Sequence, residues 1–446
     1  MGKVRRKETI VFDIDGTLTD FNKFLKDNAY RYLKDKYNIL PQDETQLELE
    51  DIYGLDLSKQ EDKKILDSFW IGPYFLKYTL LERLRTNASK CIAGFKSKGF
   101  NVEIHTSRAR IADKSAIGFI ARLLTRVQMI ANGLFIPHKN IFYYKDDESK
   151  MQAILDRAPL IVFDDKKEII DYLSNNNIRT VCVSGQHNVD VEDTKFVKKI
   201  DSFEQETIDS ILGFFLTQKD IRCINDEIKS QSFYNKIKIV GTFIYSYYKP
   251  IVLNAENIVD DVDSVLYAPN HRSTLDPLII ESVLKRHIHW AALLRFFRGE
   301  DSIFNNSKNK ILCQITKWLF VKLHFFPIER KSDNEKANNY ESIKDMSSFL
   351  KNNYYVGIFP EGTTNRKSGD FGTFDPAFLT LAKKNNSWIQ PITLFWTNEK
   401  RNKHKVIVNI GKRFKVSNLD IKEAYDIYMH EQICSMEENK RFCQTI

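Results

Sequence analysis

The chain has 446 residues, roughly twice the length of an average domain, which predicts two domains. Apolar residues make up 42%, charged residues 28% and aromatic residues 12% of the sequence, a composition that excludes disordered and low-complexity chains. The 67 basic and 59 acidic residues leave a net charge of +8, which suits contact with phosphates or an anionic membrane rather than with nucleic acid.

The sequence shows no pattern of a secretory signal, a membrane span or a disulfide framework. Its six cysteines stand far apart, with no CxxC pair. The best candidate for a span, Ile239–Tyr248, is too short to cross about 30 Å of hydrocarbon. These features predict a cytoplasmic protein with free thiols.

Residues 1–200 alternate short apolar runs with helical stretches, which is typical of a doubly wound α/β sheet. The expected strands are Thr9–Ile14, Val102–Thr106, Ile141–Tyr144, Leu160–Phe163 and Arg179–Val183. The interval between the first two strands is too long for one crossover, so we expect a helical subdomain inserted at about residues 20–95. A helical pattern covers Leu80–Lys98.

The mixed, charged stretch 201–235 is short of strand patterns and predicts the junction between the domains. The second domain is expected over residues 236–446, where aromatic-rich basic helices alternate with strands. The expected helices are Lys236–Leu253 and Lys310–Phe326, and the expected strands are Val265–Ala268, Tyr355–Phe359, Ile389–Phe395 and Val406–Ile410.

The first chemical motif is the run ETIVFDIDGTLTD, which places Asp13 and Asp15 directly after an apolar strand. Two further strands end in Thr106 (NVEIHTSR) and in the acidic pair Asp164–Asp165 (PLIVFDD). Because ligands gather at the carboxyl ends of parallel strands, we expect these groups and Lys150 to meet at one edge of the sheet. They would supply the nucleophile, acid, cation and oxygen donors that phosphoryl transfer to a carboxylate requires.

In this order the motifs resemble the haloacid-dehalogenase-like (HAD) hydrolase superfamily over residues 7–185, and the HTSR run is similar to C-type 5′-nucleotidases. The resemblance implies a Rossmann-like domain with an inserted helical cap that acts on a small phosphate ester. It implies Asp13 as nucleophile and Asp15 as general acid/base. The Mg²⁺ ligands that it implies are Asp13, the Ile14 carbonyl, Asp164 and Asp165. The phosphate-binding residues that it implies are Thr106, Ser107 and Lys150, with Lys145 as a competitor for the lysine role.

The second motif is YAPNHRSTLDPL, in which His271 precedes Asp276. An imidazole that takes a proton from a hydroxyl, backed by a carboxylate that fixes its tautomer, suits acyl transfer from a thioester to an alcohol. Downstream, FFPIER supplies Arg330, whose planar fork suits a phosphate monoester. The run IFPEGTTN supplies Gly362, where backbone amides can approach that anion closely.

These blocks resemble the glycerolipid acyltransferase family that includes lysophosphatidate acyltransferase, over about residues 236–415. The resemblance implies an α/β domain of the glycerol-phosphate acyltransferase type, with His271 as general base and Asp276 as its partner. The residues that it implies at the glycerol-phosphate site are Arg330, Glu361, Gly362 and Thr363, and Pro391 would shape the pocket. The co-substrate would be acyl-CoA or an acylated acyl carrier protein.

Together the motifs predict a bifunctional enzyme of phospholipid synthesis that meets a membrane lysophospholipid at the inner face of the cytoplasmic membrane. Two alternatives stay open: the HAD domain is a non-catalytic scaffold, or the second domain only docks a nucleotidase-like phosphatase on lipid. The stretch Trp318–Phe326 also has two possible interpretations. It could be ordinary core, which its composition favours. It could instead be a lipid-facing surface whose lysines, Lys310, Lys317 and Lys322, contact headgroups.

Overall fold

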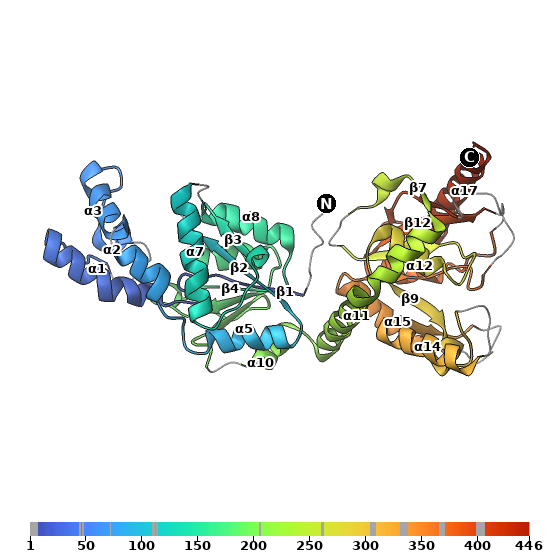
Figure 1. The fold of residues 1–446 in the computed structure, drawn as a ribbon, viewed down its shortest axis with the longest axis horizontal. Helices are drawn as coiled ribbons and strands as arrows, with labels where there is room; N and C mark the ends of the chain where they lie inside the picture. The colour runs from blue at the N-terminus through green and yellow to red at the C-terminus, as the bar shows by residue number, and fades with distance from the viewer. Residues whose placement is uncertain are drawn as a thin grey trace. The chain divides into compact units, whose positions relative to one another are not determined.

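The computed structural model divides into two compact units, Arg5–Gln218 and Lys219–Ile446 (Figure 1). The residues that it describes are 8–43, 46, 49–71, 73–108, 112, 115–204, 207–259, 263–303, 309–330, 338–364, 371–397 and 406–445. The division falls inside the stretch 201–235 that was expected to join the domains.

The first unit is built on a six-stranded parallel sheet with the strand order β3-β2-β1-β4-β5-β6. The strands are β1 (Thr9–Phe12), β2 (Asn101–Ser107), β3 (Ile141–Tyr144), β4 (Ile161–Asp164), β5 (Thr180–Val183) and β6 (Val197–Ile200). Its helices outside the cap are α5 (Ala88–Ser97), α7 (Ala116–Ala131), α8 (Asp147–Arg157), α9 (Lys167–Asn175) and α10 (Ile208–Phe215). The central strands are fully buried apolar runs, because helices cover both faces of a parallel sheet. The sequence patterns do not predict β6, whose VKKI run carries two lysines.

Helical segments inserted between β1 and β2 form the cap. They are α1 (Phe21–Tyr37), α2 (Leu49–Tyr53), α3 (Gln60–Ile71), α4 (Pro73–Leu76) and the π-helical turn η1 (Lys77–Leu81). The cap has its own apolar core, in which Phe24, Leu33 and Phe69 are buried. The helical insertion expected from the spacing of the strands is therefore present.

The cap ends earlier than the expected range of 20–95, and the expected helix Leu80–Lys98 is broken. Residues 82–87 are tied to the loop after β1, since the Arg85 amide donates to the Leu18 carbonyl at 2.7 Å. The chain then enters α5, which packs on the sheet through Phe95. Residues 88–95 thus belong to the α/β core.

The second unit contains an eight-stranded mixed sheet, with the order β10-β9-β11-β8-β12-β13-β7 and β14 paired to β12. Its strands are β7 (Ile251–Leu253), β8 (Val265–Pro269), β9 (His289–Leu293), β10 (Phe326–Ile328), β11 (Tyr355–Gly357), β12 (Trp388–Trp396), β13 (Val406–Ile410) and β14 (Phe414–Lys415). Neighbouring strands are parallel except where β12 meets β13 and β14. Its helices are α11 (Gln218–Tyr248), α12 (Asp276–Leu284), α13 (Leu294–Arg298), α14 (Lys310–Lys322), α15 (Tyr340–Lys351), α16 (Ala377–Lys384) and α17 (Ile421–Thr445).

Two helices of this unit end at other residues than the sequence patterns predict. The pattern over Lys236–Leu253 is the second half of α11 followed by strand β7, because Lys249 takes a positive φ of 45° and Pro250 follows it. The pattern over Lys310–Phe326 stops at Lys322, where the chain turns into β10. The short strands β7, β9 and β10 are not predicted from the sequence.

Among the described residues, no helix combines the length and the apolar character that crossing a bilayer requires.

Candidate active sites

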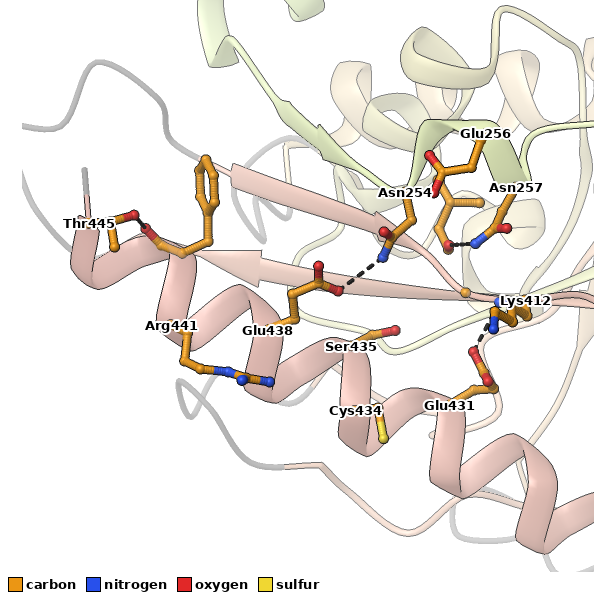
Figure 2. A pocket seen from close by; sticks show the side chains of 13 residues that line it. Asn254, Glu256, Asn257, Lys412, Glu431, Cys434, Ser435, Glu438, Arg441 and Thr445 are labelled. Atoms are coloured by element: carbon orange, nitrogen blue, oxygen red, sulfur yellow. Dashed lines mark hydrogen bonds between the residues drawn. The ribbon is translucent and has the colours of Figure 1, made fainter.

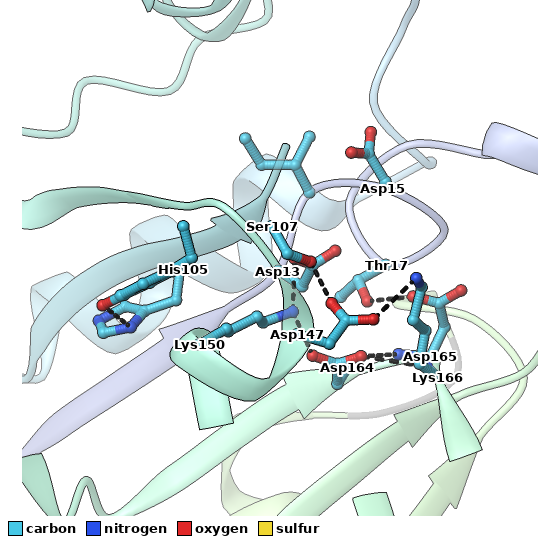
Figure 3. Close-up of polar contacts among 12 residues, drawn as sticks. Asp13, Asp15, Thr17, His105, Ser107, Asp147, Lys150, Asp164, Asp165 and Lys166 are labelled. Carbon is cyan, nitrogen blue, oxygen red and sulfur yellow. Dashed lines mark hydrogen bonds and ion pairs between the residues drawn. The ribbon is translucent and has the colours of Figure 1, made fainter. Parts of the chain in front are cut away.

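The first site lies at the carboxyl edge of the six-stranded sheet, where β1 sits between β2 and β4 and the strand order reverses. Asp13 follows β1, and Asp164 ends β4. Lys150 of α8 places its Nζ 2.7 Å from Asp13 Oδ1 and 2.7 Å from Asp164 Oδ2 (Figure 3). All three side chains are buried, whereas the competing Lys145 is exposed. One buried ammonium therefore joins two carboxylates from different strands.

Asp15 is held by two groups that the sequence analysis did not assign. Arg108 contacts both oxygens of Asp15, with Nε 2.6 Å from Oδ2. The hydroxyl of Tyr78, in the last segment of the cap, also donates to Asp15. Burial alone would raise the pKa of Asp15, but the Arg108 guanidinium holds it below its ordinary value. Asp15 is thus fixed in orientation and connected directly to the cap.

Asp165 has partners of its own beside Asp164. It accepts a hydrogen bond from Thr17 Oγ1 at 3.0 Å and lies 3.2 Å from His187 Nε2. Gly16 makes this packing possible, because its φ is +78° and a Cβ there would lie 1.8 Å from Asp165 Oδ2. Asp165 therefore braces the loop that carries Asp15.

The Ile14 carbonyl, expected as a metal ligand, is engaged within the turn after β1. It accepts hydrogen bonds from the Leu18 amide at 2.9 Å, the Thr19 amide at 2.9 Å and Thr19 Oγ1 at 3.0 Å. Three donors surround this oxygen, and its expected role as a metal ligand stays a prediction.

The two residues expected to hold phosphate at the end of β2 differ in their contacts. Thr106 Oγ1 is buried and has no hydrogen-bond partner among the described residues. A buried hydroxyl without a partner is costly, so this atom is suited to a ligand oxygen. Ser107, by contrast, already donates to Asp147, which also accepts from Lys166 at 3.0 Å.

The donor chemistry of this site fits Mg²⁺. The charged side chains that interact here are four carboxylates and two cations: Asp13, Asp15, Asp164, Asp165, Lys150 and Arg108. Burial raises the pKa of Asp13, Lys150 opposes the rise and the other carboxylates add to it, so a cation at this position would favour the ionised form of Asp13. Mg²⁺ is commonly bound by one or two carboxylates, with water and substrate phosphate completing its shell. Asp13 and Asp164, the buried carboxylates that Lys150 brings together, are the pair that would hold the ion.

The second site centres on His271, in the loop after β8, and on Asp276, the first residue of α12. His271 Nδ1 lies 2.9 Å from Asp276 Oδ2. Because a carboxylate only accepts, Nδ1 carries the proton, and Nε2 is left as the basic nitrogen. The imidazole stacks on Phe359 at 4.1 Å between ring centroids, and Phe359 stacks in turn on Trp290. The ring that would accept a proton is thus held by Asp276 at its edge and by Phe359 at its face.

Asp276 is fully buried and satisfied by several donors. Besides His271, the backbone amides of Arg272 and Ser273 donate to Oδ2, at 2.6 Å and 2.7 Å. Trp396, at the end of β12, donates its indole Nε1 to Oδ1 at 3.0 Å. These donors fix the carboxylate at the orientation that His271 requires.

Replacing Trp396 by phenylalanine removes one donor to Asp276 and keeps an aromatic ring against Tyr248. We expect acyl transfer to fall about tenfold, since a hydrogen bond to a charged group contributes about 1.5–3 kcal/mol. Trp388→Phe is the matched control, because Trp388 in the same strand donates to Asp263 at 3.0 Å, away from the dyad. Equal rates for the two variants would show that Trp396 does not position Asp276.

The residues expected at the glycerol-phosphate site are adjacent to the dyad, but two of them have structural contacts. Glu361 is buried, and its oxygens accept the amides of His271 and Gly372, both at 2.8 Å. Arg330 NH1 donates to the Gly362 carbonyl at 3.3 Å. Glu361 therefore ties the histidine loop to the loop at Gly372, while Arg330 stands beside the Glu361–Thr363 segment. Thr363 is exposed, and Pro391 is buried within β12.

A separate cavity of about 630 Å³ lies between α17 and the turn η4 (Ala255–Asn257), and it includes neither His271 nor Asp276 (Figure 2). Its acidic side chains accept hydrogen bonds within the cavity wall: the Asn254 side chain donates to Glu438 at 2.9 Å, and the Lys412 backbone amide donates to Glu431 at 3.0 Å. This cavity is therefore not the candidate acyl-transfer site.

Comparison with known proteins decides the family of the second unit. Residues 250–394, which include His271, Asp276, Arg330 and Glu361, match the protein-family model described as Acyltransferase. Residues 250–394 are an acyltransferase domain. The chloroplastic 1-acyl-sn-glycerol-3-phosphate acyltransferase LPAT1 of Arabidopsis thaliana is 26% identical over 156 residues, which cover 35% of this chain and 38% of that protein. The chain thus spans well under half the length of this curated relative.

Two solved structures are similar at low sequence identity. The 1-acyl-sn-glycerophosphate acyltransferase PlsC of Thermotoga maritima is 18% identical, with a TM-score of 0.34, and the match covers 50% of this chain and 84% of that one. A family IA HAD hydrolase of Entamoeba histolytica is 14% identical, with a TM-score of 0.31, and the match covers 46% of this chain and 98% of that one.

Sequence reasoning missed three residues that hold the acidic groups: Arg108, Tyr78 and Trp396. Arg108 directly follows the HTS run, so its place at the end of a strand was a usable signal. Tyr78 and Trp396 stand far from the motifs in sequence, and nothing local marks them.

Proposed function

We propose that the chain is a bifunctional enzyme with a phosphomonoester hydrolase in its first unit and a glycerolipid acyltransferase in its second. The observation that supports this proposal is that each unit has its own set of reactive side chains. The first unit has a candidate nucleophile with its partners, and the second has a candidate base with its carboxylate. Lys150 joins Asp13 to Asp164 in one unit, and His271 pairs with Asp276 in the other.

In acyl transfer, His271 Nε2 takes the proton of the acceptor hydroxyl as its oxygen attacks the thioester carbonyl of acyl-CoA or an acylated carrier protein. The new C–O ester bond forms, the C–S bond breaks, and the proton passes from His271 to the leaving thiolate. Asp276 stabilises the imidazolium between these events. Arg330, with the amides near Gly362, would bind the phosphate of 1-acylglycerol-3-phosphate or a related lysophospholipid. The family of residues 250–394 and the activity for which the Arabidopsis thaliana relative is named support this acceptor.

In hydrolysis, Asp13 attacks the phosphorus of a small phosphate ester, the P–O bond to the leaving alcohol breaks, and the leaving oxygen takes a proton from water, since the Arg108 guanidinium keeps the pKa of Asp15 low. Asp15 then takes a proton from the water that cleaves the aspartyl phosphate. Lys150 and Thr106 would hold the phosphate oxygens. Mg²⁺ held by Asp13 and Asp164 would offset the charge of the phosphate. The cap that follows β1 suits a small substrate over which it can close.

Mg²⁺ is expected to raise the unfolding temperature of the first unit, because it binds only the folded arrangement of Asp13 and Asp164. At a concentration of about 100 times its dissociation constant, the ion would add about 2.7 kcal/mol. Differential scanning calorimetry with and without MgCl2 measures the shift. Asp164→Asn should abolish it, and Asp171→Asn, on the exposed face of α9, should retain it. A shift that survives Asp164→Asn would contradict this metal site.

We propose that the acyltransferase unit works as a peripheral protein at the inner face of the cytoplasmic membrane. Helix α14 buries Phe320 on one face but exposes an apolar row on the other: Ile311, Ile315, Trp318 and Val321. Lys310, Lys317 and Lys322 are exposed on the same helix. The stretch Trp318–Phe326 was open between core and a lipid-facing surface. Its side chains divide between the two: Trp318 is 52% exposed, whereas the buried ones are Phe320, Leu323, Phe325 and Phe326. An apolar face with lysines beside it suits the interface of an anionic bilayer.

The test is an assay of the purified full chain for both reactions. One arm supplies lysophosphatidate with acyl-CoA or acylated carrier protein, and the other supplies a panel of phosphorylated metabolites with MgCl2. We expect a diacylated product in the first arm and inorganic phosphate in the second. Failure of either arm on broad panels would remove that half of the proposal.

A further inference from the structure

Helix α7 of the first unit presents a row of large apolar side chains to its exposed side. The row, which we call the α7 face, consists of Phe119, Ile120, Leu123, Val127 and Ile130, each between 45% and 63% exposed. A helix that covers a sheet normally turns its apolar side inward and its polar side to water. In α7 the inward side, with Ala121 and Met129, is already buried. The α7 face is therefore additional to the packing that the fold requires.

The α7 face is built on an anchored helix. Ser115 caps its first turn by accepting the Gly118 amide at 3.2 Å. Gln128 donates to the carbonyls of Tyr78 and Glu82, at 2.9 Å and 3.0 Å, which binds α7 to the base of the cap. Apolar exposure continues beside the helix at Leu81, 72% exposed, and just after it at Phe135, 67% exposed. Exposed apolar side chains thus occur in the segments next to α7 as well as on the helix itself.

The charges of α7 have one sign. Arg122 and Arg126 are its charged residues, and the run from Ala116 to Ala131 contains no Asp or Glu. Exposed apolar side chains together with arginines and no acidic residue are the composition of helices that lie in the interface of an anionic bilayer. Two copies of α7 meeting face to face would instead bring four arginines together without an acidic residue from either helix.

We propose that the α7 face docks the hydrolase unit on the surface of an anionic phospholipid bilayer. Helix α7 follows β2, whose end carries Thr106, Ser107 and then Arg108, and Arg108 NH1 reaches Thr125 of α7 at 3.5 Å. Docking would therefore hold the catalytic edge of the first unit close to the lipid headgroups. The inference concerns binding, and it stands whether or not the site hydrolyses a phosphate ester.

The experiment uses the full chain and vesicles of phosphatidylcholine, with or without phosphatidylglycerol, that contain a photoactivatable phospholipid. Lipid adducts are mapped to peptides after irradiation. We expect adducts within residues 116–131 when phosphatidylglycerol is present. The double variant Phe119→Glu, Leu123→Glu should lose these adducts and keep those on α14. Val189→Glu, at a residue of the same unit that is 74% exposed, should leave the α7 adducts unchanged.

Two results would overturn the proposal. The first is labelling of α14 in wild-type protein without labelling of α7. The second is a dimer in sedimentation velocity that the double variant dissociates, which would assign the α7 face to a second copy of the chain. Circular dichroism and the unfolding temperature of the full chain serve as the fold check, and the single variant Val127→Glu replaces the double variant if that one misfolds.

Discussion

Replacing His271 by alanine is expected to lower the rate of acyl transfer by a factor of about 10²–10⁴, the usual contribution of a positioned general base. The change removes the nitrogen that takes the acceptor proton and leaves Asp276 with its three other donors, Arg272, Ser273 and Trp396. The fold of the second unit should survive, because the His271 side chain is 17% exposed and its backbone amide still reaches Glu361. Initial rates of product formation at saturating acyl donor measure the effect.

His430→Ala is the matched control, since His430 lies on α17 of the same unit, outside the dyad. It should leave acyl transfer unchanged. A His271→Ala variant that retains its fold and transfers acyl groups at the wild-type rate would exclude His271 as the base. Phosphate release by the first unit should be equal in all of these proteins, because His271 belongs to a different domain.

Replacing Asp13 by asparagine is expected to reduce phosphate release by a factor on the order of 10⁴ or more, as loss of the nucleophile does in other enzymes with covalent intermediates. The amide has the size of the carboxylate but cannot form the aspartyl phosphate. Lys150 keeps its contact with Asp164 at 2.7 Å, so the buried ammonium retains a carboxylate partner. Inorganic phosphate released from the best substrate of the panel is the measurement.

Asp171→Asn serves as the control for this change and should leave hydrolysis intact. Rapid quench with a labelled substrate adds a second measurement, because wild-type protein should carry a labelled acyl phosphate that Asp13→Asn lacks. Labelling of the asparagine variant to the wild-type extent would identify another nucleophile and contradict the role of Asp13.

Much of the fold could be predicted from local patterns. The strands that surround the first site are continuous apolar runs ending in polar residues, so the runs TIVF and IVFD are sufficient by themselves to identify β1 and β4. The end of the cap could not be predicted in this way. Residues 82–87 lie in a helical pattern, but the contact between Arg85 and Leu18 breaks it, and a contact between distant residues has no local signature. Short strands such as β7 and β10, with three residues each, give too little periodicity to be recognised.

The sequence predicts those residues of the candidate sites that stand together in short motifs. Asp13 with Asp15, and His271 with Asp276, stand close in sequence, and the structure brings each group to one place. The partners that fix these acids come from elsewhere: Tyr78 from the cap and Trp396 from β12. The contacts of the Ile14 carbonyl have a similar origin, because the turn after β1 directs the Leu18 and Thr19 donors onto it.

The claim that the two units carry separate active sites is tested most directly by one comparison of four proteins: wild type, Asp13→Asn, His271→Ala and the double variant. Phosphate release and acyl transfer are measured on the same preparation of each. The proposal predicts that Asp13→Asn loses only phosphate release, that His271→Ala loses only acyl transfer and that the double variant loses both. Loss of both activities in either correctly folded single variant, or of neither, would contradict it.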